Sequence, residues 1–109
     1  MSSYTTPAKA SITTTGTTSI VAAQGARSFI NMYSITMSNE SATDTFVDVY
    51  DGATVVCPKI AVPAGLGHSI NLQKPMRLAE NSALSVKSSA AVTTLNVTVF
   101  YDVEPSGNG

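Results

Sequence analysis

The only histidine of this 109-residue chain lies in the stretch Val62-Pro63-Ala64-Gly65-Leu66-Gly67-His68. Two glycines could let the backbone approach a phosphate, and His68 could act on the bound group as a base. A phosphate loop follows a strand and opens a helix, however, whereas the next residues, Ser69-Ile70-Asn71-Leu72, alternate as in a strand. A Pro-Ala-Gly turn between two strands explains the same residues, and we expect that turn.

Three aspartates, Asp44, Asp48 and Asp51, could be imagined as calcium ligands, because calcium prefers hard oxygen donors. Their spacing is not that of an EF-hand loop. Asp44 falls in a predicted loop and Asp51 in a predicted turn, where aspartate is common for local reasons. We therefore expect no metal site and no cofactor.

Nucleophilic catalysis has no clear signature either. The sequence lacks a G-x-S-x-G elbow, and one histidine among 28 Ser and Thr residues does not define a triad. Arg77 and Glu80 lie in one predicted loop and are expected to form a surface pair or to cap that loop. The single Cys57 leaves no partner for an intrachain disulfide, and we expect a neutral reduced thiol. We expect no catalytic residues and a protein that is not an enzyme.

Charge is sparse in this chain. Only 12% of residues are charged, the net charge is −1, and the six basic residues are scattered along the sequence. Nucleic-acid binding requires a basic patch or stripe, so we expect no nucleic-acid partner. No apolar run approaches the about 18 residues that span a membrane, and no basic-then-apolar signal region opens the sequence. We expect no membrane partner.

Composition favours an all-β protein, because β-branched residues are abundant and small turn-forming residues separate them. No segment shows a convincing helical period. Regular strand–turn spacing predicts a single antiparallel β-sandwich, jelly-roll-like, of about eight strands. The predicted strands are Ala10–Thr14, Thr18–Ala23, Ser28–Ser38, Thr45–Tyr50, Ala53–Cys57, His68–Leu72, Ala83–Lys87 and Val92–Val103.

The dipeptide Asp51-Gly52 is the strongest hairpin signal and predicts a type I′ turn. Pro58 lacks a backbone donor, which places that strand at a sheet edge or ends it there. A two-residue Asp51-Gly52 turn sets the register, with three pairs expected: Tyr50 with Ala53, Asp48 with Val55, and Phe46 with Cys57.

Both faces of this hairpin are therefore largely apolar, with Val47, Val49 and Val56 on the second face. A two-layer sandwich buries only one face. Either a loop or the N-terminal segment covers the other face, or that face contacts another chain. The candidate partner-binding residues are Tyr4, Phe46, Tyr50 and Val55.

The strand Ser28–Ser38 is also apolar on both sides, with Ile30 and Met32 on one face and Tyr33, Ile35 and Met37 among those on the other. A β-bulge could exchange the two faces midway. The last strand, by contrast, alternates regularly, which predicts one buried and one wet face.

The first 20 residues contain 11 Ser or Thr, with Lys9 as the only charge. Such a segment buries little and is normally disordered. We divide the chain into an extended N-terminal arm (1–18), a β-sandwich (19–104) and a tail (105–109), and expect arm and tail to pack on a neighbouring subunit. The alternative is that the arm folds back as an edge strand of its own sandwich. We expect both in part, with Met1–Ala8 reaching out and the chain joining the sandwich from Ala10.

Several short motifs follow one another in a set order: Gly25-Ala26-Arg27, Met37-Ser38-Asn39, Val49-Tyr50-Asp51-Gly52, Val62-Pro63-Ala64-Gly65, and Leu78-Ala79-Glu80-Asn81-Ser82-Ala83-Leu84, then a Thr/Val-rich strand. In order and spacing, from about Thr17 to Val103, they resemble the small tailed-phage virion structural proteins of the capsid decoration or cement type. The resemblance implies a β-sandwich without catalytic residues.

It also implies a function as a bacteriophage structural protein that binds the outside of the shell and clamps neighbouring subunits. The expected partner is the major capsid protein, with a dimer or trimer of this chain on the shell. The expected location is the capsid surface of the virion, after synthesis in the host cytoplasm. The alternatives are a receptor- or carbohydrate-binding module of a head or tail fibre, and a head–tail connector component. Sugar binders usually expose aromatic side chains, whereas most of the seven here lie in predicted strands.

Overall fold

The computed structural model describes residues 5–92 and 94–105. Within these ranges the chain forms eight β-strands: β1 (Thr6–Ile12), β2 (Thr17–Val21), β3 (Ser28–Asn39), β4 (Thr45–Asp51), β5 (Thr54–Val62), β6 (Gly67–Arg77), β7 (Leu84–Ser88) and β8 (Leu95–Pro105). The same ranges include no helix long and apolar enough to cross a membrane.

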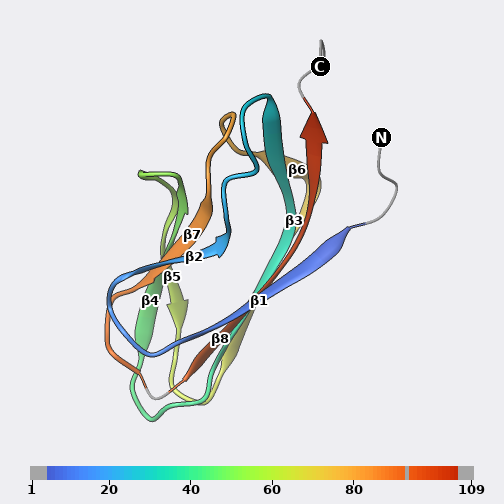
Figure 1. The fold of residues 1–109 in the computed structure, drawn as a ribbon. Coiled ribbons are helices and arrows are strands. Elements are labelled where there is room, and N and C mark those ends of the chain that lie inside the picture. The colour runs from blue at the N-terminus through green and yellow to red at the C-terminus, as the bar shows by residue number, and fades with distance from the viewer. Residues whose placement is uncertain (1–4, 93, 106–109) are drawn as a thin grey trace.

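The strands form two four-stranded antiparallel sheets, seen as two layers in Figure 1. We call them sheet I, with the order β1-β8-β3-β6, and sheet II, with the order β2-β7-β4-β5. The pairs are nested, because β1 pairs with β8, β2 with β7, β3 with β6 and β4 with β5. This is the arrangement of a jelly roll, in which a long hairpin is rolled into two layers. The predicted jelly-roll-like sandwich is confirmed.

The hydrophobic core lies between the two sheets and follows the period-two alternation of the strands. In β8, for example, Leu95, Val97 and Val99 are fully buried, whereas Asn96 and Thr98 between them are half-buried. The buried hydrophobic side chains are Ile12, Val21, Ile30, Met32, Ile35, Met37, Val47, Val49, Ile60, Val62, Leu78, Leu84, Val86, Val92, Leu95, Val97 and Val99.

The expected arm boundary at residue 18 is wrong, because the sandwich begins at Thr6. Every residue of β1 pairs with β8, from Thr6 opposite Tyr101 to Ile12 opposite Leu95. Ile12 is buried and Ala8 packs against the core, so these two apolar side chains anchor a segment whose composition suggested disorder. β1 is an edge strand of its own sandwich, as the alternative proposed, but it begins before Ala10.

Both boundaries of the sandwich, predicted at residues 19 and 104, therefore differ in the structure, where the strands extend from Thr6 to Pro105. Pro105, assigned to the tail, is the last residue of β8 and lies opposite Ser28. Residues 6–8, expected to reach out, pair with β8 instead. Residues 1–4 and 106–109 lie outside the described ranges, so the expectation that they pack on a neighbouring subunit stays a prediction. The strands β5 and β6 are longer than expected, since β5 continues through Pro58 and β6 continues to Arg77. Pro58 nevertheless lies in an edge strand, as predicted.

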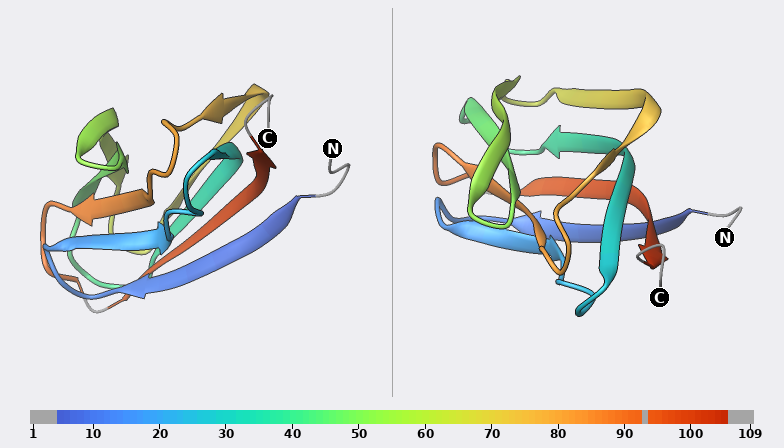
Figure 2. Two further views of the ribbon diagram at one scale, coloured as in Figure 1. Left: turned by 45° about the horizontal axis from the view of Figure 1, so that its top comes forward. Right: turned by 90° about the horizontal axis from the view of Figure 1, so that it is seen from above.

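A β-bulge in β3 explains the two-sided pattern of that strand. Met32 lies opposite Tyr101 and Ser34 opposite Phe100, which leaves Tyr33 as an extra residue in β3. Ile30 and Met32 before the bulge, and Ile35 and Met37 after it, are all buried in the core. The predicted exchange of faces is confirmed. In Figure 2, β3 and the end of β8 bend together in this part of the sheet.

The β4–β5 hairpin has a different turn from the one predicted. Asp51 pairs with Thr54, so the two turn residues are Gly52 and Ala53. Of these only Gly52 has a positive φ, 61°, which fits a type II′ turn with glycine first. Beyond the turn, the register between β4 and β5 shifts twice. Tyr50 lies opposite Val55, whereas the predicted register placed it opposite Ala53.

The turn between β5 and β6 matches the prediction. The Leu66 N–H donates to the Pro63 carbonyl oxygen at 3.0 Å, and Gly65 has φ of 73°. A positive φ at the third residue is the mark of a type II turn, which favours glycine. His68 follows as an exposed residue of β6, and its Nδ1 lies 3.2 Å from the Ala61 carbonyl oxygen. The stretch is thus a strand–turn–strand connection.

Candidate functional site

The outer face of sheet II carries an exposed apolar surface. In β4 the side chains alternate strictly, with Val47 and Val49 fully buried and Phe46 51% exposed. Tyr50 is half-buried on the same side as Phe46. In the neighbouring strand β5, Val55 and Val56 are 45% and 37% exposed. We call Phe46, Tyr50, Val55 and Val56 the Phe46 face.

A register shift in the β4–β5 hairpin adds Val56 to this surface. Val55 lies opposite Tyr50 and Cys57 opposite Val49, so Val56 is an extra residue in β5. A bulge of this kind turns an additional side chain outward. Cys57, predicted on the face with Phe46, instead packs against the core. Val56, predicted with Val47 and Val49, is exposed, so the sequence-based faces were wrong for both residues.

The structure places three of the four predicted partner-binding residues on one face of sheet II, where Asp48 lies between Phe46 and Tyr50 in β4. These residues, Phe46, Tyr50 and Val55, share the outer face of sheet II. Among the described residues, about half of the Phe46 surface stays exposed. Tyr4 lies outside the described residues. That these side chains bind a partner stays a prediction.

The three aspartates considered as calcium ligands each bind a different backbone segment. Asp44 accepts the N–H of Ala64 at 2.8 Å, and Asp48 accepts the N–H of Lys59 at 2.7 Å. Asp51 accepts the N–H of Ala79 at 3.0 Å and the Ser82 hydroxyl at 2.6 Å. Each carboxylate therefore fixes a loop or bulge. Within the described ranges, no three His, Cys, Asp or Glu side chains are grouped to hold a metal ion.

The outer face of sheet I carries both polar and aromatic side chains, and Phe100 there is 39% exposed. One cross-strand row consists of Lys9, Thr98, Thr36 and Ser69, from β1 to β6. The Ser69 hydroxyl donates to the Thr36 hydroxyl at 3.2 Å.

A cleft on this face of sheet I contains a hydrogen-bonded network that sequence reasoning missed. Asn31 Nδ2 donates to Asp102 Oδ1 at 2.9 Å and to Glu104 Oε1 at 3.1 Å. The Tyr33 hydroxyl donates to Asp102 Oδ2 at 2.7 Å. The Arg77 guanidinium forms an ion pair with Glu104. The cleft is therefore organised by five side chains from three strands.

Strand register and the β3 bulge position these side chains. Asn31 lies directly opposite Asp102 on one side and Arg77 on the other, which places all three on one face. The bulge re-aims Tyr33 toward Asp102. Arg77 lies at the end of β6, and its Cζ is 4.8 Å from the centroid of the Phe29 ring, within cation–π range.

Contrary to the sequence-based expectation, Arg77 does not pair with Glu80. The Glu80 carboxylate instead accepts the backbone N–H of Arg27 at 2.6 Å. Arg27 has a positive φ of 65°, and this bond helps to hold the connection before β3. Because β6 extends five residues past its predicted end at Leu72, Arg77 reaches Glu104 on β8.

The network shifts two acid–base equilibria. The hydrogen bond from Asn31, followed by the bond from Arg77, lowers the pKa of the Glu104 carboxyl. The hydrogen bond to Asp102, followed by partial desolvation, raises the pKa of the Tyr33 phenol. Around neutral pH the cleft thus holds an ionised Glu104 carboxylate and a protonated Tyr33 hydroxyl.

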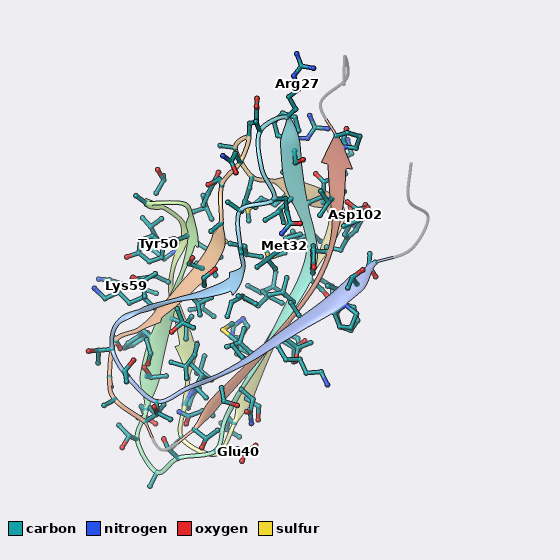
Figure 3. All side chains as sticks on the ribbon, viewed as in Figure 1. Arg27, Met32, Glu40, Tyr50, Lys59 and Asp102 are labelled. Carbon is teal, nitrogen blue, oxygen red and sulfur yellow. The ribbon has the colours of Figure 1, made fainter. Side chains whose placement is uncertain are left out.

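The cleft has a volume of about 700 Å³, and we call it the Asp102 cleft. Its lining residues are Asn31, Tyr33, Pro75, Arg77, Asp102, Val103, Glu104 and Pro105. One sequence signal could have indicated the cleft. Asp102 and Glu104 are two residues apart in the last strand and so share its wet face. Figure 3 shows that Asp102 and Tyr50 lie on opposite sides of the sandwich, with Met32 in the core between them.

No protein-family model matches this chain, and no curated protein matches it either.

Proposed function

We propose that this protein is a bacteriophage virion structural protein of the capsid decoration type, which binds the outside of the shell through its Phe46 face. The observation that supports the proposal is the group of exposed apolar side chains on the outer face of sheet II, where Phe46 is 51% and Val55 is 45% exposed. Exposed apolar patches rimmed by polar residues commonly mark protein contacts. The jelly roll is also an architecture of viral capsid proteins, which agrees with the sequence resemblance.

The contact would be made by side chains of the face and not by strand addition. β5 is the free edge of sheet II next to the Phe46 face. Pro58 lacks a donor there, and Lys59 has a positive φ of 53° within an irregular stretch. Proline, lysine and bulges are common devices that stop another strand from pairing with an edge. With strand pairing disfavoured at this edge, the exposed apolar side chains are the part of sheet II that is suited to contact a partner.

Docking would stabilise the complex mainly by removing this surface from water, at roughly 25 cal/mol per Å² of apolar area. Phe46 and Tyr50 are suitable central contacts, because large aromatic side chains dominate the energetics of many interfaces. The proposed partner is the major capsid protein, with this chain as a dimer or trimer on the virion surface. Clamping of neighbouring shell subunits needs a rigid body, which the nested strand pairing supplies.

Co-sedimentation with shells of the parent phage tests the proposal. Wild-type protein is expected to bind saturably, and Phe46→Asp to bind at least about tenfold more weakly, because a buried unpaired charge is costly. Phe100→Asp is the matched control, since Phe100 is 39% exposed on the opposite sheet and its loss should leave binding unchanged. Absence of saturable binding, or equal loss in both variants, would contradict the proposal.

The test of the N-terminal segment needs a shorter deletion than residues 1–18. Removing 1–18 would delete β1 and the start of β2, and so would damage both sheets. Deletion of residues 1–4 leaves every described strand intact. Loss of shell binding in this variant would assign part of the contact to the segment that contains Tyr4.

A head–tail connector component would also bind through an apolar face. Shells assembled without the portal vertex separate the two roles. A decoration protein is expected to bind such shells in many copies, whereas a connector component should bind only shells that carry the vertex.

A further inference from the structure

Bonds between its own side chains hold the polar groups of the Asp102 cleft in place. Asn31 is only 6% exposed, and its amide holds both carboxylates in place. Tyr33 fixes the second oxygen of Asp102, and Arg77 pairs with Glu104. Fixed polar groups in a cleft of several hundred Å³ are characteristic of small-molecule sites.

The network leaves hydrogen-bonding capacity for a ligand. A carboxylate has about four lone-pair sites, and Asp102 uses one on each oxygen within the protein. Arg77 has five N–H donors, of which its ion pair with Glu104 engages only part. Acceptors therefore lie beside donors in a partly exposed cleft. A hydroxyl group, which donates and accepts at once, complements this arrangement.

We infer that the Asp102 cleft is a binding site for a neutral saccharide, with adjacent sugar hydroxyls donating to Asp102 and Glu104 and accepting from Arg77. Tyr33, Pro75 and Pro105 line the cleft and supply apolar surface for the C–H groups of a sugar ring. The site is distinct from the Phe46 face, because it lies on the other sheet (Figure 3).

A cation fits the cleft less well. The Asn31 Nδ2 lies between Asp102 Oδ1 and Glu104 Oε1 and donates to both. Amide hydrogens thus occupy the position between the carboxylates where a metal or ammonium ion would gain most. An ammonium group would also meet the guanidinium of Arg77. An anionic ligand would face two carboxylates against one guanidinium, so a neutral polyhydroxylated ligand is favoured.

Binding, and not hydrolysis, fits the state of Glu104. Glycoside hydrolysis by a carboxyl pair requires a general acid whose pKa is raised, so that it still carries its proton. Asn31 and Arg77 instead lower the pKa of Glu104. The carboxylate is suited to accept hydroxyl hydrogen bonds.

The proposed function gives this site an orientation, although the site itself does not depend on that function. A copy docked on the shell through its Phe46 face would turn the cleft on the opposite sheet toward the medium. Glycans of a cell surface would then be within reach of the virion. Sugar binding by the free protein and shell binding are separate measurements, so either can fail alone.

Nuclear magnetic resonance of the full chain tests the inference. The probes are the methyl glycosides of glucose, galactose, mannose and N-acetylglucosamine at millimolar concentrations. At least one is expected to shift the signals of Asn31, Tyr33 and Asp102 saturably. Asp102→Asn, which is nearly isosteric, should weaken that binding by about tenfold, the effect of losing a hydrogen bond to a charged group.

Two further variants guard against an indirect effect. Tyr33→Phe should also weaken sugar binding, since it frees the Asp102 carboxylate from its fixed position. Glu40→Gln is the matched control, because Glu40 is exposed and bonds to Asn96 outside the cleft. The inference is overturned if no glycoside gives saturable shifts in the cleft, or if Asp102→Asn binds the glycoside as tightly as the wild type does. It is also overturned if spermine or calcium shifts these signals and no glycoside does.

Discussion

The Tyr33 hydroxyl donates a hydrogen bond of 2.7 Å to Asp102 Oδ2, across the join between β3 and β8. Tyr33 is the extra residue of the β3 bulge, and Asp102 lies opposite Asn31, two residues earlier in β3. The irregularity that exchanges the two faces of β3 therefore also directs a phenol toward a carboxylate. One local feature serves both the core and the cleft.

This bond predicts a pH-dependent effect of Tyr33→Phe. Asp102 raises the pKa of Tyr33 above its ordinary value of 10.0, so the contribution to stability is complete below about pH 10 and is lost as the pH rises through the raised value. Tyr33→Phe should lower the free energy of unfolding at neutral pH, and the difference from wild type should vanish in strong alkali. Urea unfolding at a series of pH values measures it. A difference that stays constant up to strong alkali would refute the coupling.

Glu104 should behave in the opposite sense. Its pKa is lowered from the ordinary value of 4.5, so its contribution is present above that value and is lost as the pH falls through the lowered one. Carbon NMR titration of the Glu104 carboxyl should show an upward shift of the pKa in Arg77→Met and a larger one in Asn31→Ala, because the Asn31 bond is the larger cause. The reverse order would contradict the network described for the cleft.

Gly52→Ala should destabilise the protein by about 1–3 kcal/mol. Gly52 has a φ of 61°, and a Cβ at this position would lie 2.7 Å from the Ser82 hydroxyl oxygen. Ser82 bonds to Asp51, so movement away from the Cβ would disturb the link between the hairpin and the β6–β7 connection. Thermal unfolding measures the effect.

Gly16→Ala is the control for that substitution. Its nearest neighbour would be the Thr14 hydroxyl oxygen at 3.9 Å, an ordinary contact, and its φ is not positive. The change should be within about 0.5 kcal/mol. Equal effects of the two substitutions would show that the turn conformation is not the cause.

Two neighbouring residues of β4 should respond very differently to alanine. Val47 is fully buried, so Val47→Ala should cost about 1–3 kcal/mol through lost burial and a cavity. Phe46 is 51% exposed, so Phe46→Ala should change the free energy of unfolding by about 0.5 kcal/mol or less. Chemical denaturation of the monomeric protein measures the free energy of unfolding of both variants. A large effect at Phe46 would mean that its face is part of the core and not a docking surface.

The sequence was sufficient for features set by local chemistry. Period-two alternation located the buried face of β8, glycine placed the turns at Gly52 and Gly65, and the missing donor of Pro58 indicated an edge strand. A bulge in β3 could be foreseen, because one strand cannot bury both of its faces in a two-layer sandwich. Each of these inferences depends on residues close together in the chain.

Composition was a poor guide to the N-terminal segment. Ser and Thr predominate there, but strand pairing uses backbone groups that all residues share, and Ala8 and Ile12 are sufficient to anchor β1. Whether a polar segment becomes an edge strand depends on a free edge of β8 being available. That edge exists only once the sandwich has formed.

The Asp102 cleft depends on tertiary structure for the same reason. Asn31 and Asp102 are 71 residues apart, and Arg77 comes from a third strand. Their meeting requires the nested pairing of the jelly roll and one extra residue in β3. A shift of one residue in either register would turn these side chains to the other face of the sheet. Local residue patterns therefore specify that the chain forms strands and where its turns fall, whereas long-range strand pairing decides which polar side chains share a cleft and which apolar side chains stay exposed.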